Sequence, residues 1–335
     1  KSQNIIDTLS ITIGTNPQQF FHYFDLSSIG LEAGDKVEYF FEVWDNDRIN
    51  GSKSSKSQLM TYKVPSLEEI DKQTSESNEA IKNEMEEAIK EVQKLQKESE
   101  DLNKKMVDKK ELSWEDKNQI KSLLEKQKDL QERLESIKNE NEQKSLNERE
   151  YKEVNEELVE KQKQLEELFE KLMQDEELNQ LFKELQELLD QVDKDKVNEM
   201  LEKMKLSNEE MEKMLDRNLE IFKQLEFESK LEETINKLTD LSEKQEQLSE
   251  ETLDKENETE ELKQEQKNIN QEFDKVKKDI EDLDKMNKEL EEPNSFDKME
   301  DQQQNIDNDL QESENSLNKN QRNKASNSQK NASQK

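Results

Sequence analysis

The residues that could do chemistry are few, and the first group lies in the segment DNDRING at residues 45–51. Asp45, Asp47 and Asn50 would offer the oxygen ligands that calcium prefers. However, the spacing to Gly51 is one residue longer than in an EF-hand loop, and no bidentate glutamate follows. The sequence therefore favours a plain hairpin loop in this segment, with calcium binding as the alternative.

His22 is the single histidine, and the chain has no cysteine. One histidine without thiolates does not supply the ligands of a transition-metal site, so we interpret His22 as a structural residue of a strand. Disulfides and a cysteine nucleophile are excluded. No glycine follows Gly51, which excludes a phosphate-binding GxxxxGK[ST] loop. We predict no catalytic residue, no cofactor and no enzyme activity.

The helical part of the sequence offers residues that could contact a partner. Carboxylates are abundant there, but charge-rich helix faces are usually solvated, whereas catalysis needs a desolvated pair in a cleft. Four methionines between 200 and 214 recur at helical spacing, which favours a core position over an adaptable peptide-binding surface. Trp114 is expected to pack against the neighbouring hairpin. The interaction candidates are Trp114, Met211, Met214, Phe222 and Phe227.

Residues 1–64 contain the calcium candidates and must position them, and they differ in composition from the rest of the chain. They hold all four glycines, five of the eleven phenylalanines and three of the four tyrosines. Alternating apolar residues predict strands at 8–13, 20–26, 37–44 and 58–64, with turns at Gly34 and at 45–51. We expect the C-terminal part of an antiparallel, immunoglobulin-like β-sandwich whose earlier strands lie upstream.

After Pro65 the hydrophobic period changes from two to about 3.5. Ser66 with Glu69, and Ser113 with Asp116, are capping pairs that predict helix starts. Eight positions from Ile81 to Met106, seven of them apolar and the other Ser99, follow alternating steps of four and three. The predicted fold class is mainly α, with long antiparallel helical hairpins or a coiled coil after the β-sandwich. Parallel strands of a dimer fit the same heptads.

The remaining boundaries follow from breaks in this pattern. A polar turn is predicted at 139–147, and the widest apolar stripe at 151–192. Ser207 and Glu210 predict a new helix start, and the thinner seam at 241–261 predicts a bundle that narrows into a two-stranded arm. The predicted domains are a partial β-sandwich (1–64), a helical hairpin (65–145), a helical bundle or coiled coil (146–250), a coiled-coil helix (251–292), and a weak helix with a basic, polar, disordered tail (293–335).

Charge is unevenly distributed along the chain, whose net charge is −33. Residues 1–64 carry six basic and eight acidic side chains, and residues 319–335 carry five basic and no acidic ones. The segment between them therefore holds a net charge of about −36. Such a segment repels phosphate backbones and anionic lipid surfaces, so we expect no nucleic-acid partner.

Several short sequence motifs resemble those of a family of large bacterial envelope proteins, known notably from Bacteroidota and catalogued only as a domain of unknown function. The β-rich part carries YFDL at 23–26, GD at 34–35, YFFEV at 39–43 and PSLEE at 65–69. The helical part carries ELSWEDK at 111–117 and, most specifically, LDR at 215–217 followed by FKQLEF at 222–227.

The resemblance covers about residues 20–250. It implies N-terminal membrane helices that are missing from this chain, an immunoglobulin-like periplasmic domain and a long helical region. The chain would then be a piece of a periplasmic protein anchored to the inner membrane through those missing helices. The family supplies no catalytic residues.

Two functions follow as expectations. The first is a non-enzymatic scaffold that spaces or docks a partner complex in the envelope, with self-association open. The alternative is a periplasmic holdase that clasps unfolded clients, and a regulator of a hydrolase is a third, less favoured hypothesis. A scaffold predicts a fixed partner, whereas a holdase predicts exposed apolar patches and promiscuous binding.

Overall fold

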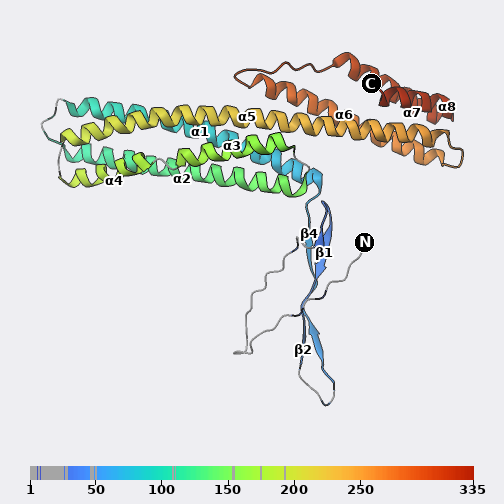
Figure 1. Cartoon of the computed structure of the whole chain (residues 1–335), viewed down its shortest axis with the longest axis horizontal. Coiled ribbons are helices and arrows are strands. Elements are labelled where there is room, and N and C mark those ends of the chain that lie inside the picture. Colours follow the sequence, from blue (N-terminus) through green and yellow to red (C-terminus); the bar gives the residue numbers. More distant parts are fainter. Residues whose placement is uncertain are drawn as a thin grey trace. The chain divides into compact units, whose positions relative to one another are not determined.

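A computed structural model of the chain describes residues 6, 8, 26, 29–45, 49, 51–107, 109, 111–152, 155–173, 176–191 and 194–335. They belong to two compact units, Lys1–Asp71 and Lys72–Lys335. The chain is mainly helical, with short antiparallel sheets in the first unit (Figure 1). The predicted mainly α class is confirmed.

The first unit contains one antiparallel ladder divided into two short sheets. β1 (Lys36–Tyr39) pairs with β4 (Met60–Lys63), and β2 (Glu42–Trp44) pairs with β3 (Ser54–Lys56). At the junction, the backbone N–H of Phe41 donates to Ser57 Oγ at 3.0 Å. The strands predicted at 37–44 and 58–64 are thus confirmed, the first as two pieces. Those predicted at 8–13 and 20–26 fall almost entirely outside the described residues.

Two positions in this unit explain a turn and a helix start that the sequence predicts. Gly34 has φ +88°, a left-handed conformation that favours glycine, and its N–H donates to the Pro65 carbonyl at 3.0 Å. Ser66 caps the first helix: its hydroxyl accepts from the N–H of Glu69 at 3.2 Å, and the Glu69 carboxylate accepts from the N–H of Ser66 at 2.8 Å. This predicted capping pair is confirmed.

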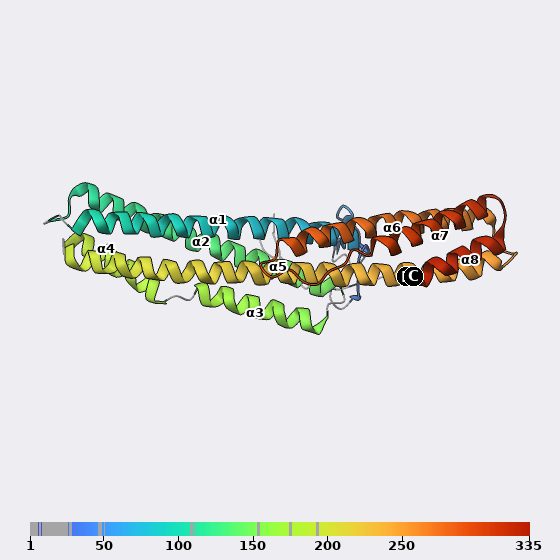
Figure 2. The ribbon, with the colours of Figure 1, turned by 90° about the horizontal axis from the view of Figure 1, so that it is seen from above.

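Eight helices follow among the described residues. In chain order they are α1 (Leu67–Val107), α2 (Trp114–Tyr151), α3 (Glu156–Met173), α4 (Glu176–Gln191), α5 (Lys194–Leu253), α6 (Thr259–Lys288), α7 (Glu300–Asn318) and α8 (Arg322–Ser333). In the second unit, α1 to α4 lie along the first part of α5, and α6 to α8 lie along its second part (Figure 2).

The first bundle is built on three heptad seams, from α1, α2 and the first part of α5. The predicted seam of α1 is buried at every position from Ile81 to Met106, which confirms its register. Glu98 of α1 pairs with Lys126 of α2 at 2.6 Å. The seam residues of α5 recur at steps of four and three: Val197, Leu201, Met204, Asn208, Met211, Leu215, Asn218, Phe222 and Leu225.

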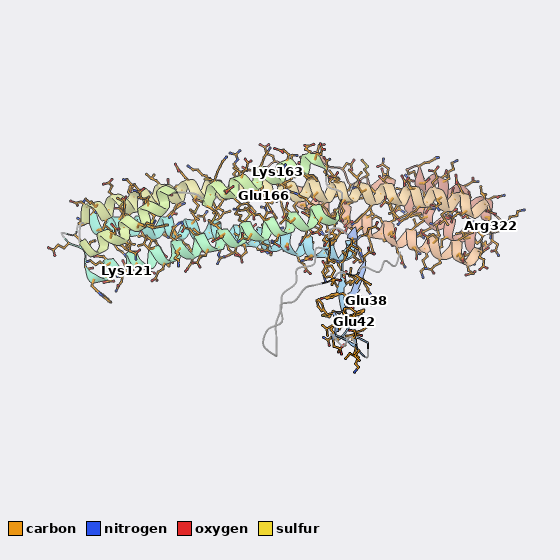
Figure 3. All side chains as sticks on the ribbon, turned by 60° about the horizontal axis from the view of Figure 1, so that its bottom comes forward. Glu38, Glu42, Lys121, Lys163, Glu166 and Arg322 are labelled. Atoms are coloured by element: carbon orange, nitrogen blue, oxygen red, sulfur yellow. The ribbon has the colours of Figure 1, made fainter. Side chains whose placement is uncertain are left out.

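Order along the helices shows how these segments run. On α1 and α5, Gln93 donates to Glu212 and Asn103 donates to Glu202, so the residue number rises on one helix as it falls on the other. The helices α1 and α5 are therefore antiparallel. Helix α3 packs on the outer side of this bundle, where Glu166 (Figure 3) pairs with Arg149 of α2 at 3.6 Å.

The second bundle contains the second part of α5 together with α6, α7 and α8. Its apolar core includes Leu248 of α5, Phe273 of α6 and Leu317 of α7, and it takes in Ala325 and Ala332 of α8. Between α7 and α8 the backbone of Asn320 adopts φ +57°, and the N–H of Gln321 donates to the Ser316 carbonyl at 2.8 Å. This left-handed cap reverses the chain, so α8 returns along α7.

Two predicted helix boundaries are wrong because the buried seam continues through them. The polar segment 139–147 is not a turn: α2 runs on to Tyr151 and buries Asn141 and Ser145 at seam positions. Ser207 does not start a helix, since α5 is continuous from Lys194. A serine that matches a capping pair is accepted inside a helix when the seam on both sides of it is packed.

Two further predictions fail at the C-terminal side. The tail at 319–335 is not disordered, because α8 occupies most of it and buries Ala325, Gln329 and Ala332. The bundle also does not narrow into a two-stranded arm, since α7 and α8 pack on α5 and α6 where the seam thins. Both errors have one cause: α8 is buried through alanine, serine and glutamine, which sequence hydrophobicity does not register.

Candidate interaction site

The candidate site is an apolar groove of about 650 Å³ in the second bundle. Its first wall is α5, where Leu231, Ile235 and Leu238 are joined by Thr239 and Ser242. These residues are spaced by three and four, so helix geometry places them on one face. Ile235 is 52% exposed, although it belongs to the most apolar stripe of this part of α5.

The second wall is α7, and α6 forms the floor. Met299, Gln303, Ile306 and Leu310 follow the same helical spacing along α7. The α6 residues of the floor are Ile269, Phe273, Ile280 and Leu283. Met299 is 57% exposed and stands at φ +53°, a strained backbone conformation for a side chain of this kind. Its N–H donates to Asp297 Oδ1 at 2.9 Å, which supports that conformation.

The connection between α6 and α7 closes one end of the groove. Phe296 packs edge-on against Phe227 at 5.9 Å between ring centroids. The side chain of Asn287 clamps the backbone of Asn294, with an N–H donated in each direction at 2.8 and 2.9 Å. These contacts place the segment from Ser295 to Met299 along the groove margin.

The other end of the groove is closed by the last residues of α8. Ala332, Ser333, Gln334 and Lys335 line it. Ser242 of α5 donates to the Ser333 carbonyl at 2.8 Å, and Lys335 pairs with Asp309 of α7 at 2.5 Å. Helix α8 thus lies between α5 and α7 for twelve residues, and the groove is the continuation of that position along the bundle.

A layer of buried amides fixes α8 against its neighbours. Gln266 of α6 is fully buried and exchanges two hydrogen bonds of 3.1 Å with Gln245 of α5. Its Oε1 also accepts from Ser313 of α7 at 2.6 Å and from Gln329 of α8 at 3.0 Å. Each of the four helices contributes one residue, so this layer specifies the register of the bundle.

The far end of α8 is held by Arg322, which stands at the end of the second bundle (Figure 3). Its guanidinium donates to the Asn257 carbonyl at 2.7 Å and to Thr259 Oγ1 at 2.9 Å, and also contacts the Asp254 carbonyl. The connection between α5 and α6 is thereby tied to α8. Arginine suits this task because its planar donors reach several acceptors at once.

A buried charge cluster lies where α1, α2 and the middle of α5 meet. Lys144 of α2 donates to Asn78 Oδ1 of α1 at 2.9 Å and lies 5.0 Å from the Phe222 ring centroid. Burial lowers the pKa of the Lys144 ammonium and raises the pKa of the Glu226 carboxyl. Shifted pKa values often mark catalytic groups, but Lys144 makes contacts that hold three helices together.

The structure separates the five predicted interaction candidates. Met211, Phe222 and Phe227 are buried in the core, and Met214 packs partly buried against it. Of the five, only Trp114 is largely exposed, at 80%, so the expected packing against the neighbouring hairpin is wrong. Trp114 begins α2 after a capping box made by Ser113 and Asp116, which sets it at the helix end.

Of the calcium candidates, Asp45 is described, whereas Asp47 and Asn50 lie outside the described residues, as does His22. Asp45 Oδ1 accepts the N–H of Lys53 at 2.9 Å, and the Asp45 N–H donates to the Lys53 carbonyl at 2.9 Å. A residue that closes a β-hairpin makes such bonds, so they support the hairpin loop that the sequence favours over a calcium site. Within the described residues, no three histidine or carboxylate side chains gather as metal ligands would.

The first unit exposes apolar side chains on both faces of its ladder, because neighbouring residues of a strand point to opposite faces. Tyr39, Phe40, Val43 and Trp44 are exposed on the ladder (Figure 3, which labels Glu38 and Glu42 of the same strands). Lys56 lies 4.6 Å from the Phe40 ring centroid and covers part of it. Exposed aromatic residues at this density are a candidate contact surface.

Sequence reasoning identified the residues of the groove but not the groove. Ile269, Ile280 and Leu283 lie in the predicted coiled-coil helix at 251–292, and Ile306 and Leu310 lie in the predicted weak helix that follows it. The sequence did not predict α8, which covers only part of the apolar surface formed by α5, α6 and α7. The signal available was the spacing of Ala325, Gln329 and Ala332 at steps of four and three, in a segment without a larger apolar residue.

The comparisons with known proteins give no relative: the sequence matches no family model and no curated protein, and the structure matches no solved structure. Among the described helices, none combines the length and the hydrophobicity needed to cross a membrane. A proposal for the function therefore rests on the geometry and the sequence.

Proposed function

We propose that this chain is the non-enzymatic scaffolding part of a membrane-tethered cell-envelope protein, and that it spaces or docks a partner complex. The observation that carries the proposal is α5, a continuous helix of 60 residues that forms part of both bundles. At about 1.5 Å per residue it spans roughly 90 Å. A single helix packed along its length holds two sets of partner surfaces at a fixed separation.

The finer architecture belongs to the same proposal. Long antiparallel helical hairpins or a coiled coil are supported by the heptad seams and by the order of ion pairs, such as Glu98 with Lys126. An immunoglobulin-like domain is supported by the antiparallel ladder of the first unit. The periplasmic location and the inner-membrane anchor rest on the resemblance of the sequence to the envelope family.

Affinity purification from native envelopes tests the proposal. The tagged protein should retain one partner complex at fixed stoichiometry through a salt wash, while a control with α5 interrupted by Ser229→Pro should not. Ser229 is exposed on α5 between Leu225 of the first core and Leu241 of the second, and proline removes a helix hydrogen bond and clashes with the preceding turn. Recovery of many proteins at low and variable stoichiometry would refute the scaffold.

A second candidate, the holdase, is favoured by one specific observation. The groove and the exposed aromatic residues of the first unit are apolar surfaces of the kind that clasps unfolded chains. A holdase should suppress the aggregation of several unrelated unfolded proteins at equimolar concentration. Suppression of this kind would replace the scaffold proposal, and its absence would remove the holdase.

A further inference from the structure

We infer that the groove between α5, α6 and α7 binds a basic amphipathic helix of a partner protein, about three turns long. This inference deepens the proposed docking function and rests on it. The helix would occupy the position in the bundle that α8 holds next to it, with its apolar face on Ile235, Ile306 and Met299.

The length of the occupant follows from the walls. Along α7 the lining residues extend from its N-cap Met299 to Leu310, a rise of about 16 Å, or three turns. On α5 the lining residues extend further, from Leu231 to Gln245, a rise of about 21 Å. The shorter wall therefore sets the length of the occupant at about three turns.

The shape of the occupant follows from continuity with α8. In the adjoining stretch α8 inserts Ala325, Gln329 and Ala332 between α5, α6 and α7 and completes a four-helix bundle. In the groove the same three helices continue with exposed Ile235 and Met299. Apolar residues at steps of three and four on both walls are spaced to receive the side chains of another helix.

The charge of the occupant follows from α8 and from the walls. The segment 319–335 is the basic part of the chain, and its lysines pair with acids of α7: Lys335 with Asp309, and Lys324 with Glu312. Lys298 and Lys335 line the groove, but its walls are acidic in sum. Residues 231–245 of α5 carry four acidic and two basic side chains, and residues 300–310 of α7 carry four acidic side chains and no basic one. A basic polar face fits this setting, whereas an acidic helix or an anionic lipid would be repelled.

The test uses the whole chain and fluorescein-labelled 14-residue peptides. The probe has leucines at helical spacing and lysines elsewhere, and a first control has the same composition with the helical period broken. A second control replaces the lysines by glutamates. Fluorescence anisotropy should show saturable binding of the probe, with at least tenfold weaker binding of both controls.

Variants of the protein locate the binding. Ile235→Asn combined with Met299→Asn should weaken binding of the probe at least tenfold, about 1.4 kcal/mol, because both side chains would face the peptide. Both are already half exposed, so the fold should survive. Leu206→Asn is the matched control, since Leu206 is also 52% exposed on α5 but lies in the first bundle, and it should leave binding unchanged.

Several outcomes would overturn the inference. Equal binding of the probe and its period-broken isomer would show non-specific attraction by charge. Unchanged binding in the double variant would place the peptide elsewhere. A concentration-dependent dimer in light scattering that the double variant abolishes would assign the groove to a second copy. If residues 1–335 bind the probe but a longer natural form does not, the groove is occupied by a further segment of the protein's own sequence.

The inference and the proposed function can fail separately. If a stoichiometric complex is recovered from envelopes and persists in the Ile235→Asn, Met299→Asn variant, the scaffold stands and the groove is not its docking site. If the probe binds as described, no stable complex is recovered, and unfolded proteins are protected from aggregation, the groove is a helix-binding site but the scaffold function is refuted.

Discussion

Replacing Gln266 by leucine tests the amide layer, and the structure gives the magnitude. Gln266 is fully buried and bonds to Gln245, Ser313 and Gln329. The variant leaves the Gln245 amide and the Gln329 Nε2–H without these partners, at about 1–3 kcal/mol each. The Ser313 hydroxyl can turn to the carbonyl four residues earlier. A buried leucine returns roughly 1–2 kcal/mol, so the midpoints of these ranges give a net loss of about 2–3 kcal/mol.

The matched control removes the whole layer. When Gln245, Gln266 and Gln329 all become leucine and Ser313 becomes alanine, the layer holds no polar side chain. Asn270 Oδ1 loses its 3.0 Å bond from Gln266 Nε2 in this variant as it does in the single one. The stability should then return to within about 1 kcal/mol of the wild type, or exceed it.

The assay is guanidinium unfolding followed by circular dichroism at 222 nm. Hydrogen exchange read by mass spectrometry on peptides from α7 and α8 assigns the effect to the second bundle. Protection of α8 amides should fall in Gln266→Leu and recover in the control. A single variant within about 0.5 kcal/mol of the wild type, or a quadruple variant much less stable than the single one, would refute the reasoning.

Three other predictions follow from single side chains. Gln127 is fully buried, and neither its Nε2 nor its Oε1 has a partner among the described residues, so Gln127→Leu should stabilise the first bundle by about 1–2 kcal/mol in guanidinium unfolding; a loss would contradict this. Burial raises the pKa of the Glu226 carboxyl above 4.5, so the folded protein keeps this proton to a higher pH than the unfolded chain does. The free energy of unfolding should therefore fall as pH rises from 4.5 to the raised folded value. In urea unfolding across pH 4 to 8, Glu226→Gln should be more stable than the wild type above that window and equally stable below it. Although burial would raise the pKa of Asp116, hydrogen bonds from Lys109 and Ser113 lower it, and Asp116→Ala should cost about 1–2 kcal/mol, whereas Glu115→Ala on the exposed side of the same turn should cost less than half of that.

The parts of the fold that the sequence predicted are those that local chemistry decides. The capping pairs at Ser66 and Ser113 need only residues three apart, and both form. The α1 seam needs only a regular period, and every position is buried. Local chemistry was misleading at Ser207, because the packed seam of α5 outweighs the preference of a serine for a helix start.

Tertiary contacts decide what the sequence did not predict. Helix α8 has no apolar side chain larger than alanine, and alone it would be unstable in water. It forms because its small residues let it approach α5, α6 and α7 closely, and because the amide layer satisfies Gln329 Nε2. The candidate groove could not be predicted for the same reason, since its existence depends on where α8 lies.

The position of α8 also explains how so acidic a chain folds around its basic end. The segment between 64 and 319 carries a net charge of about −36, and packing its helices side by side increases its self-repulsion. A basic helix placed between α5 and α7 lowers that repulsion where it lies, and Lys324 and Lys335 meet acids directly. Along the groove the walls remain acidic in sum, although Lys298 and Lys335 stand at its margin. A basic partner helix would therefore cover the exposed apolar surface and lower the remaining repulsion. Affinity for such a helix should therefore fall with added salt while retaining a salt-independent part, because the apolar contacts are not screened.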